Sequence, residues 1–158
     1  AVTFADNYAG FLKFAAPILR KHRVPVTMFV HTDYVGSQVG RPKMSWADLI
    51  SLEREGWFTV ASQTRTHPAD LRSLSARSLA EEMNGSKRAL EQKLGHRVNF
   101  IAYPNGKYDL RVATAAQAAG YTMAFTEAQT PAERSPNLFM VARYVHTKWR
   151  DAIAQARS

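Results

Sequence analysis

A regular alternation of short apolar runs with longer amphipathic ones most constrains the fold of this chain. The strand-like runs are residues 1–6, 25–31, 57–62, 98–103 and 121–126. The segments with helical periodicity or helix start and stop signals are residues 10–22, 45–56, 75–94 and 109–120. Apolar strands that alternate with helices predict a parallel sheet covered by helices. A sixth strand is expected at residues 140–146, followed by a short helix.

Local signals support the expected helix boundaries. Ser45 with Asp48 three residues later resembles a capping box. Gly95 and Gly120 follow the last apolar positions of their segments, as C-terminal glycines do. Pro17 lies inside an expected helix and predicts a kink or a late start there.

The length and the charge of the chain narrow its class. The 158 residues suit a single domain with one core. The net charge is +8, but no run of Lys and Arg exceeds two residues, which favours a generally basic surface over a nucleic-acid site. The absence of cysteine excludes disulfides, thiolate ligands and a cysteine nucleophile.

Membrane and targeting signals are weak in this sequence. No apolar run approaches the roughly 20 residues needed to span a membrane, and no signal peptide is visible. The chain opens inside an expected strand, which is consistent with a leader or an N-terminal segment that has been removed.

Polar residues follow the ends of the expected strands. In parallel α/β folds, ligand sites lie at the carboxyl ends of the strands. That rule places one set of residues on a single rim: Asp6, His31, Gln63–His67, Tyr103–Asn105 and His146. A carboxylate, one or two imidazoles and a backbone donor from the 104–106 turn are suited to metal-assisted hydrolysis.

Each of these residues also has a simpler interpretation. Asp6 could cap the helix that follows it, and His67 could be a turn residue before Pro68. His146 could be an ordinary exposed histidine, and the Pro-Asn-Gly turn is by itself a generic signal.

Several motifs in chain order nevertheless resemble one family. VTFADNY (2–8) is similar to a T-F-D-D-G motif, and SQTRTHP (62–68) to S-H-T-x-x-H-P. FIAYPNGKYD (100–109) is similar to F-A-Y-P-Y-G-x-Y-D, and MVARYVH (140–146) resembles a final motif. Nearly the whole chain thus resembles the polysaccharide deacetylases, the NodB-homology domains of carbohydrate esterase family 4.

The resemblance implies a fold, a reaction and a location. The fold is a distorted, incomplete (β/α) barrel of the TIM-like kind, here a single domain over residues 1–158. The reaction is removal of acetyl groups from glycans that contain N-acetylglucosamine, with a divalent metal, often zinc, held by one Asp and two His. It also implies a secreted, periplasmic or cell-surface protein, with a glycan rather than nucleic acid as partner and no transmembrane segment.

Carried over by position, the motifs assign a metal site that departs from the family pattern. Asp6 and His67 match two metal ligands, whereas Gln63 replaces the first histidine and offers only a weak amide ligand. Ala5 stands at the position of the general base and leaves it vacant. His146 is the candidate general acid.

The third motif assigns the substrate side of the site. The backbone N–H of Asn105 is the candidate oxyanion donor, and Tyr103, Pro104, Asn105 and Gly106 are the candidate substrate-binding residues. Ala102 stands where the family motif has Arg.

These departures leave three functions open. The chain is a weakened deacetylase with altered ligands, a non-catalytic glycan-binding or scaffold pseudoenzyme, or a binder of anionic polymers. Two further alternatives concern single residues: Ala5 could be an engineered inactivation, or His31 could reach the site and replace the missing imidazole.

Overall fold

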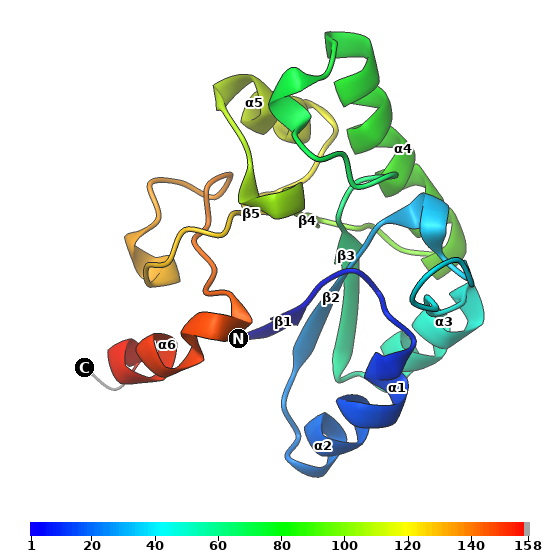
Figure 1. Ribbon diagram of the computed structural model, residues 1–158. Helices are drawn as coiled ribbons and strands as arrows, with labels where there is room; N and C mark the ends of the chain where they lie inside the picture. Colours follow the sequence, from blue (N-terminus) through cyan, green and yellow to red (C-terminus); the bar gives the residue numbers. More distant parts are fainter. Residues whose placement is uncertain (157–158) are drawn as a thin grey trace.

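The computed structural model describes residues 1–156 and contains one parallel sheet in the order β1-β2-β3-β4-β5 (Figure 1). The strands are β1 (Val2–Phe4), β2 (Val26–Val30), β3 (Phe58–Ser62), β4 (Phe100–Ala102) and β5 (Met123–Phe125). Each strand pairs with the next one in the chain, and the sheet curls into part of a barrel with α1 to α5 around its outside (Figure 1). The predicted incomplete (β/α) barrel is therefore confirmed.

The helices lie where the sequence places them. They are α1 (Gly10–Phe14), α2 (Ala16–Lys21), α3 (Trp46–Arg54), α4 (Ala76–Leu94), α5 (Leu110–Ala118) and α6 (Trp149–Ala156). The predicted break before Pro17 divides the first helical segment into α1 and α2. Short 3₁₀ turns are η1 (Thr32–Tyr34), η2 (Leu71–Ser73), η3 (Pro104–Gly106), η4 (Ala132–Arg134) and η5 (His146–Lys148).

The expected helix ends are present. Ser45 Oγ accepts from the Asp48 N–H while the Asp48 carboxylate accepts from the Ser45 N–H, so the capping box begins α3. The Ser75 side chain caps α4 by accepting from the Ser78 N–H, and Gly95 ends that helix with a φ of 79°. These signals are local, which explains why they could be read from sequence.

Alternation along each strand divides the core in two. Met28 and Val30 belong to the large cluster of apolar residues between the sheet and the helices. Phe29, which points the opposite way because side chains alternate in a strand, forms a second, smaller cluster. Its buried members are Phe29, Ala61 and Ala102, with Ala5, Phe100 and Phe125 packed against them. We call this set the inner cluster.

Residues 140–146 do not form the predicted sixth strand. Val141 makes only an isolated parallel bridge with Phe125, and two backbone donors near it bond side chains instead of other strands. The Ala142 N–H donates to Ser135 Oγ and the Phe139 N–H to Asn137 Oδ1.

The same C-terminal segment nevertheless spans the open side of the barrel. Val141 contacts the β5 edge through its bridge, and Arg143 Nη1 lies 3.4 Å from Thr3 Oγ1 on β1. In Figure 1 the segment and α6 lie beside the N-terminus. The two edge strands are therefore joined by a loop rather than by further strands.

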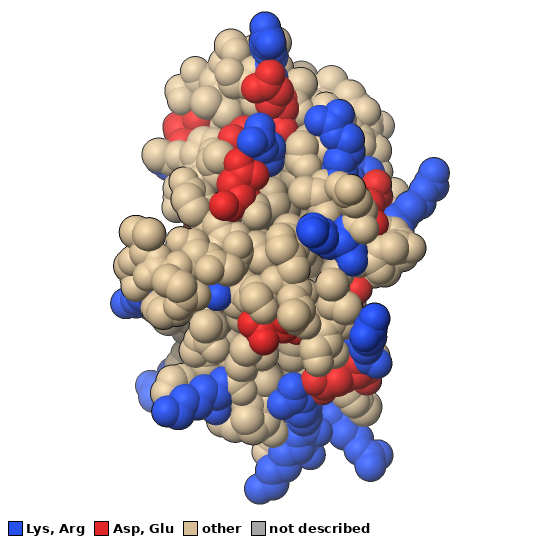
Figure 2. Space-filling model, turned by 90° about the vertical axis from the view of Figure 1, so that its right-hand side faces the viewer, with Lys and Arg blue, Asp and Glu red and all other residues tan. Residues whose placement is uncertain are grey.

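The surface carries both signs of charge. On the face that Figure 2 shows, Lys and Arg side chains are spread from top to bottom, with Asp and Glu among them. This face has no continuous basic patch. None of the helices in residues 1–156 is long and apolar enough to cross a bilayer.

Candidate metal centre

Three side chains from the ends of three strands converge on one point. Asp6 follows β1, His31 follows β2, and His67 lies in the loop after β3. One ligand atom from each lies within 4.8 Å of the others. Asp6 Oδ1 is 3.7 Å from His67 Nε2, and the imidazole centroids of His31 and His67 are 5.4 Å apart. The structure thus brings Asp6 and His67 together and adds His31 to them.

The backbone of Asp6 is held from two sides. Its N–H donates to Gln63 Oε1 at 3.0 Å, and its carbonyl accepts from Lys43 Nζ at 2.7 Å. The N-cap of α1 is Ala9, without a side-chain cap, so Asp6 does not serve as the helix cap. Its carboxylate is instead turned to His67.

His31 lies level with Gln63 in the sheet. The paired register runs through Phe29 with Ala61 and Val30 with Ser62, and the Gln63 N–H donates to the Val30 carbonyl at 2.8 Å. Continuing this register by one residue puts His31 opposite Gln63. In-register residues of neighbouring strands project to the same face, so both side chains lie near Asp6.

The imidazole of His31 is buried, and burial disfavours its charged form. It is 7% exposed, and neither ring nitrogen has a hydrogen-bond partner among the described residues. Burial lowers the pKa of His31 to about 4, with the charges of Lys43 and His67 acting in the same direction and Asp6 opposing them. The neutral imidazole is the form that binds metals.

The loop that carries His67 is fixed by a carboxylate from α4. The buried Glu82 side chain accepts from the N–H groups of Arg65 and Thr66 at 2.8 and 3.0 Å, and from Thr66 Oγ1 at 2.6 Å. His67 follows directly with a φ of 53°. Glu82 therefore sets the backbone from which His67 projects.

Arg65 fastens the His67 loop to the turn after His31. Its guanidinium bonds the Asp33 carboxylate at 2.8 and 3.3 Å, and its carbonyl accepts from the Asp33 N–H at 3.0 Å. A Cβ at Gly85 would lie 2.3 Å from Arg65 Cδ, so only glycine leaves room on α4 for this side chain. The two histidine-bearing loops are thus bonded directly to each other.

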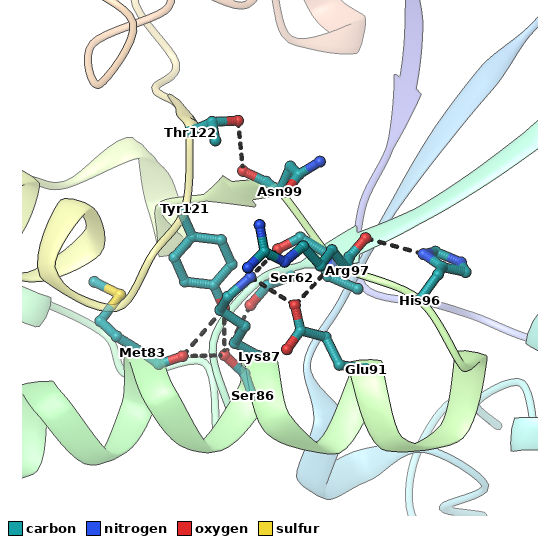
Figure 3. Close-up of polar contacts among 11 residues, drawn as sticks. Ser62, Met83, Ser86, Lys87, Glu91, His96, Arg97, Asn99, Tyr121 and Thr122 are labelled. Carbon is teal, nitrogen blue, oxygen red and sulfur yellow. Dashed lines mark hydrogen bonds and ion pairs between the residues drawn. The ribbon is translucent and has the colours of Figure 1, made fainter.

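A buried polar network holds the start of the same loop (Figure 3). Ser62 Oγ donates to Ser86 Oγ at 2.8 Å and accepts from the Thr64 N–H at 3.1 Å. The Tyr121 hydroxyl lies 3.0 Å from Ser86 Oγ and donates to the Met83 carbonyl at 3.1 Å. Burial raises the pKa of Tyr121 to about 12. The network joins β3, α4 and Tyr121 in the turn before β5.

The donor set fits a divalent transition metal. One carboxylate and two imidazoles are the ligands of many catalytic zinc sites, and a tetrahedral zinc with bonds of about 2.1 Å holds its ligand atoms roughly 3.4 Å apart. The 3.7 Å between Asp6 and His67 is already close to this spacing. The buried His31 ring has no hydrogen-bond partner among the described residues, which leaves a nitrogen free to bind a metal.

The third-motif loop lies against the loop after His67. Asn105 is exposed, has a φ of 55°, and donates from Nδ2 to the Ala69 carbonyl at 3.2 Å. Tyr103 is fully buried, its hydroxyl donates to the Phe139 carbonyl at 3.0 Å, and burial raises its pKa. Pro104 is buried and Gly106 half-buried, so the part of this stretch that faces solvent is centred on Asn105.

Ala5, which the motif resemblance assigns to the general-base position, lies in the apolar inner cluster. Ala5 packs there with Ala102, the residue at the Arg position. Arg143 places its guanidinium 5.2 Å from the Phe29 ring centroid and 3.7 Å from Glu127. Burial lowers the pKa of Arg143, while Glu127 and Asp6 oppose the shift. Sequence reasoning did not single out Arg143, because its motif gave no signal for it.

His146 is exposed at the start of η5. No described contact within residues 1–156 joins it to Asp6, His31 or His67. Its role as a general acid stays a prediction.

Known proteins are similar to this chain in sequence and fold. A family model described as polysaccharide deacetylase matches residues 1–124. The Bacillus subtilis (strain 168) protein YxkH is 25% identical over 142 residues, which are 90% of this chain and 49% of YxkH. The poly-β-1,6-N-acetyl-D-glucosamine N-deacetylase of Staphylococcus aureus (strain MSSA476) is 27% identical over 118 residues, 66% of this chain and 39% of that enzyme.

A solved structure has a similar fold. The Streptococcus pyogenes deacetylase PplD, in complex with acetate, superposes with a TM-score of 0.83 at 25% identity, over 90% of this chain and 62% of PplD. The chain spans about half, or less, of the length of the two sequence relatives.

Proposed function

Because this chain belongs to the polysaccharide deacetylase family, we propose that it binds zinc and an N-acetylglucosamine-containing glycan, and that it removes acetyl groups only weakly. The observation that carries the proposal is the 3.7 Å approach of Asp6 to His67 beside a base position occupied by Ala5. The S. aureus relative acts on poly-β-1,6-N-acetyl-D-glucosamine, which supports this class of glycan.

Asp6 and His67 are the residues that would hold the zinc ion. A zinc ion there would polarise an acetyl carbonyl and lower the pKa of a bound water. The chain itself contributes a fixed rim: Glu82 sets the His67 loop, and Asn105 ties the 104–106 turn to Ala69. An acetamide lying between the ion and this turn would be oriented by groups that are already in place.

Weak hydrolysis follows from the missing proton acceptor. Ala5 cannot take a proton from the attacking water, and loss of a general base typically lowers a rate by roughly 10²–10⁴-fold. The retained ligands and the lost base together support a domain that binds acetylated glycan more effectively than it hydrolyses the acetyl groups.

The substitution at Ala5 fits its surroundings, which supports a natural origin over an engineered one. Ala102 has also lost the side chain of the family motif, and both alanines pack with Phe29 in the inner cluster. Arg143 lies over the Phe29 ring. A single inactivating change would have left the residue at position 102 untouched.

The two other functions make different predictions. A pseudoenzyme that only binds glycan would bind oligosaccharides without zinc. A binder of anionic polymers would need a continuous basic surface, and the mixed charges in Figure 2 give it no support on that face. Its affinity would fall steeply with salt.

The test compares Ala5→Asp with Ala5→Asn in zinc-loaded protein. Acetate release is measured on β-1,6- and β-1,4-linked N-acetylglucosamine oligomers, and binding by calorimetry. We expect the unaltered chain to bind with acetate release near background and Ala5→Asp to release acetate roughly 10²–10⁴-fold faster, because it regains a base. Arg143 lies beside this cluster as a partner for the new carboxylate.

The control Ala5→Asn matches Asp in size but accepts no proton, so it should behave as the unaltered chain. Failure to bind either oligomer would overturn the glycan function. Rapid acetate release by the unaltered chain, not exceeded by Ala5→Asp, would overturn the weak activity.

We further propose a single domain over residues 1–158, of which residues 157 and 158 lie outside the described part. A polymeric glycan substrate places it outside the cytoplasmic membrane, as a secreted, periplasmic or cell-surface domain. Fractionation of the producing cells tests this location.

A further inference from the structure

We propose that His31 completes the metal centre in place of Gln63, so that the third ligand has moved sideways from β3 to β2. The inference rests on the proposed function, since it requires a metal at Asp6 and His67. It assigns a role to a residue outside every motif by which the family was recognised.

The sheet register places His31 where the missing ligand is needed. Val30 pairs with Ser62, so the next residues of the two strands, His31 and Gln63, are level with each other. Both then lie beside Asp6: Gln63 through its hydrogen bond, and His31 through the 4.8 Å grouping of ligand atoms. An imidazole at position 31 therefore substitutes for one at position 63 with a displacement of one strand.

The burial of His31 points to a ligand role. Buried polar groups are almost always paired, and both ring nitrogens of His31 lack a partner in the described residues. A histidine that serves only the core would be packed against apolar groups. His31 instead meets the rings of Tyr34 and His67 edge-on, each at 5.4 Å, and one of these belongs to the metal group.

Gln63 is already committed to another task. Its Oε1 accepts from the Asp6 N–H at 3.0 Å, and the residue is only 3% exposed. An amide oxygen is a poor match for zinc. Binding a metal through that oxygen would also leave the Asp6 N–H without its acceptor. We assign Gln63 as a positioning residue that orients the Asp6 ligand.

The Lys43 ammonium does not occupy the position that a metal ion would take between Asp6, His31 and His67. Its Nζ bonds the Asp6 carbonyl at 2.7 Å and lies 3.8 Å from the Tyr8 ring centroid. The ammonium is thereby held on the backbone side of Asp6, and the carboxylate remains free for a metal.

The first experiment counts imidazoles in the unaltered protein. Metal-free protein is loaded with one equivalent of zinc, and X-ray absorption at the zinc edge reports the number of imidazole ligands. We expect two, from His31 and His67. One imidazole, with oxygen ligands completing the shell, would overturn the role of His31.

The second experiment measures zinc affinity in variants by competition with a chelator. His31→Gln should weaken binding by roughly 100-fold or more, because a direct ligand is lost, and Gln63→Ala by about 10-fold, because only orientation is lost. The double variant His31→Gln with Gln63→His should recover most of the affinity, since it returns the imidazole to β3. His22→Gln, an exposed histidine at the end of α2, is the matched control and should bind as the unaltered chain.

The outcomes separate this inference from the proposed function. Equal zinc affinity in His31→Gln and the unaltered chain would overturn the inference and leave a site at Asp6 and His67. Absence of zinc binding in the unaltered chain would overturn the metal site altogether, while glycan binding still tests the rest of the proposed function. If circular dichroism shows that His31→Gln does not fold, the imidazole count in the unaltered protein decides whether His31 is a ligand.

Discussion

Backbone strain is concentrated around the candidate metal centre. Within residues 1–156, six non-glycine residues have positive φ, and of these only Arg23 lies away from the site loops. The others are Asp6, Asn7, Thr64, His67 and Asn105. Such conformations cost free energy and persist where the surroundings impose them, which is common at functional sites. The hydrogen bonds of Gln63 and Glu82 are the surroundings that impose them here.

The Gly106 position gives a test of how tightly the substrate-side turn is packed. Gly106 has a φ of 64°, and a Cβ there would lie 2.8 Å from the Glu127 backbone nitrogen. Gly106→Ala should lower the free energy of unfolding by about 2–4 kcal/mol, from the left-handed conformation and the clash together. Urea denaturation measures the change.

The matched control for this prediction is Gly95→Ala. Gly95 has a φ of 79°, but a Cβ added there would meet no atom within 4 Å, so this variant should lose only about 1 kcal/mol. Equal losses at both positions would show that the Glu127 contact does not restrain the turn.

At the scale of elements, His96 links the loop before β4 to α3. His96 Nε2 lies 2.6 Å from Glu53 Oε2, and Nδ1 lies 2.9 Å from the Arg97 carbonyl. The bond to Glu53, and secondarily the Arg97 carbonyl, raises the pKa of His96 above its usual 6.5. Folding therefore favours the protonated imidazole. The resulting stabilisation is complete at a pH below the pKa of His96 in the unfolded chain. It is lost as the pH rises through the pKa of His96 in the folded chain.

This linkage predicts a pH-dependent stability that His96→Gln removes. The urea midpoint of the unaltered chain should fall between pH 6 and pH 8, and the fall should be smaller in the variant. His22→Gln removes an exposed histidine and should keep the original slope. An unchanged slope in His96→Gln would assign the pH dependence to other groups.

Elements with local signals were predictable, and those that depend on distant partners were not. The capping box of α3 and the 19-residue α4 between Ser75 and Gly95 follow from adjacent residues. Residues 140–146 have a strand-like composition, but the Ala142 N–H within them bonds Ser135, and the Phe139 N–H just before them bonds Asn137. The sequence carries no sign of that competition.

The candidate site was likewise predictable only in part. Asp6 and His67 could be named from motifs, whereas His31 remained only an alternative because no motif contains it. The signal that identifies it is the register of β2 with β3, in which Val30 pairs with Ser62. Register is a property of two strands together. Both strands are buried on both faces over their last three residues, so neither run of residues alone specifies it.

At the scale of the whole molecule, the candidate metal centre ties together β1, β2 and β3. Ligands that bind only the folded state stabilise it by mass action, by about 2.7 kcal/mol at 100 times the Kd. For a chain of this size that corresponds to a rise of roughly 5–10 °C in Tm. Thermal unfolding with and without zinc measures the rise.

His67→Gln, which removes one ligand, should abolish most of this stabilisation, and a chelator should reverse it in the unaltered chain. An equal rise in His67→Gln would mean that zinc stabilises the fold from another place.

The level placement of positions 31 and 63 beside Asp6 has a consequence for ancestry. A forebear with histidine at both positions would have had a spare imidazole, so either one could drift to glutamine while the metal stayed bound. The metal ligand can then pass from one strand to its neighbour while every intermediate sequence keeps a complete metal centre. Descendants of such a forebear should include chains that carry histidine at both positions.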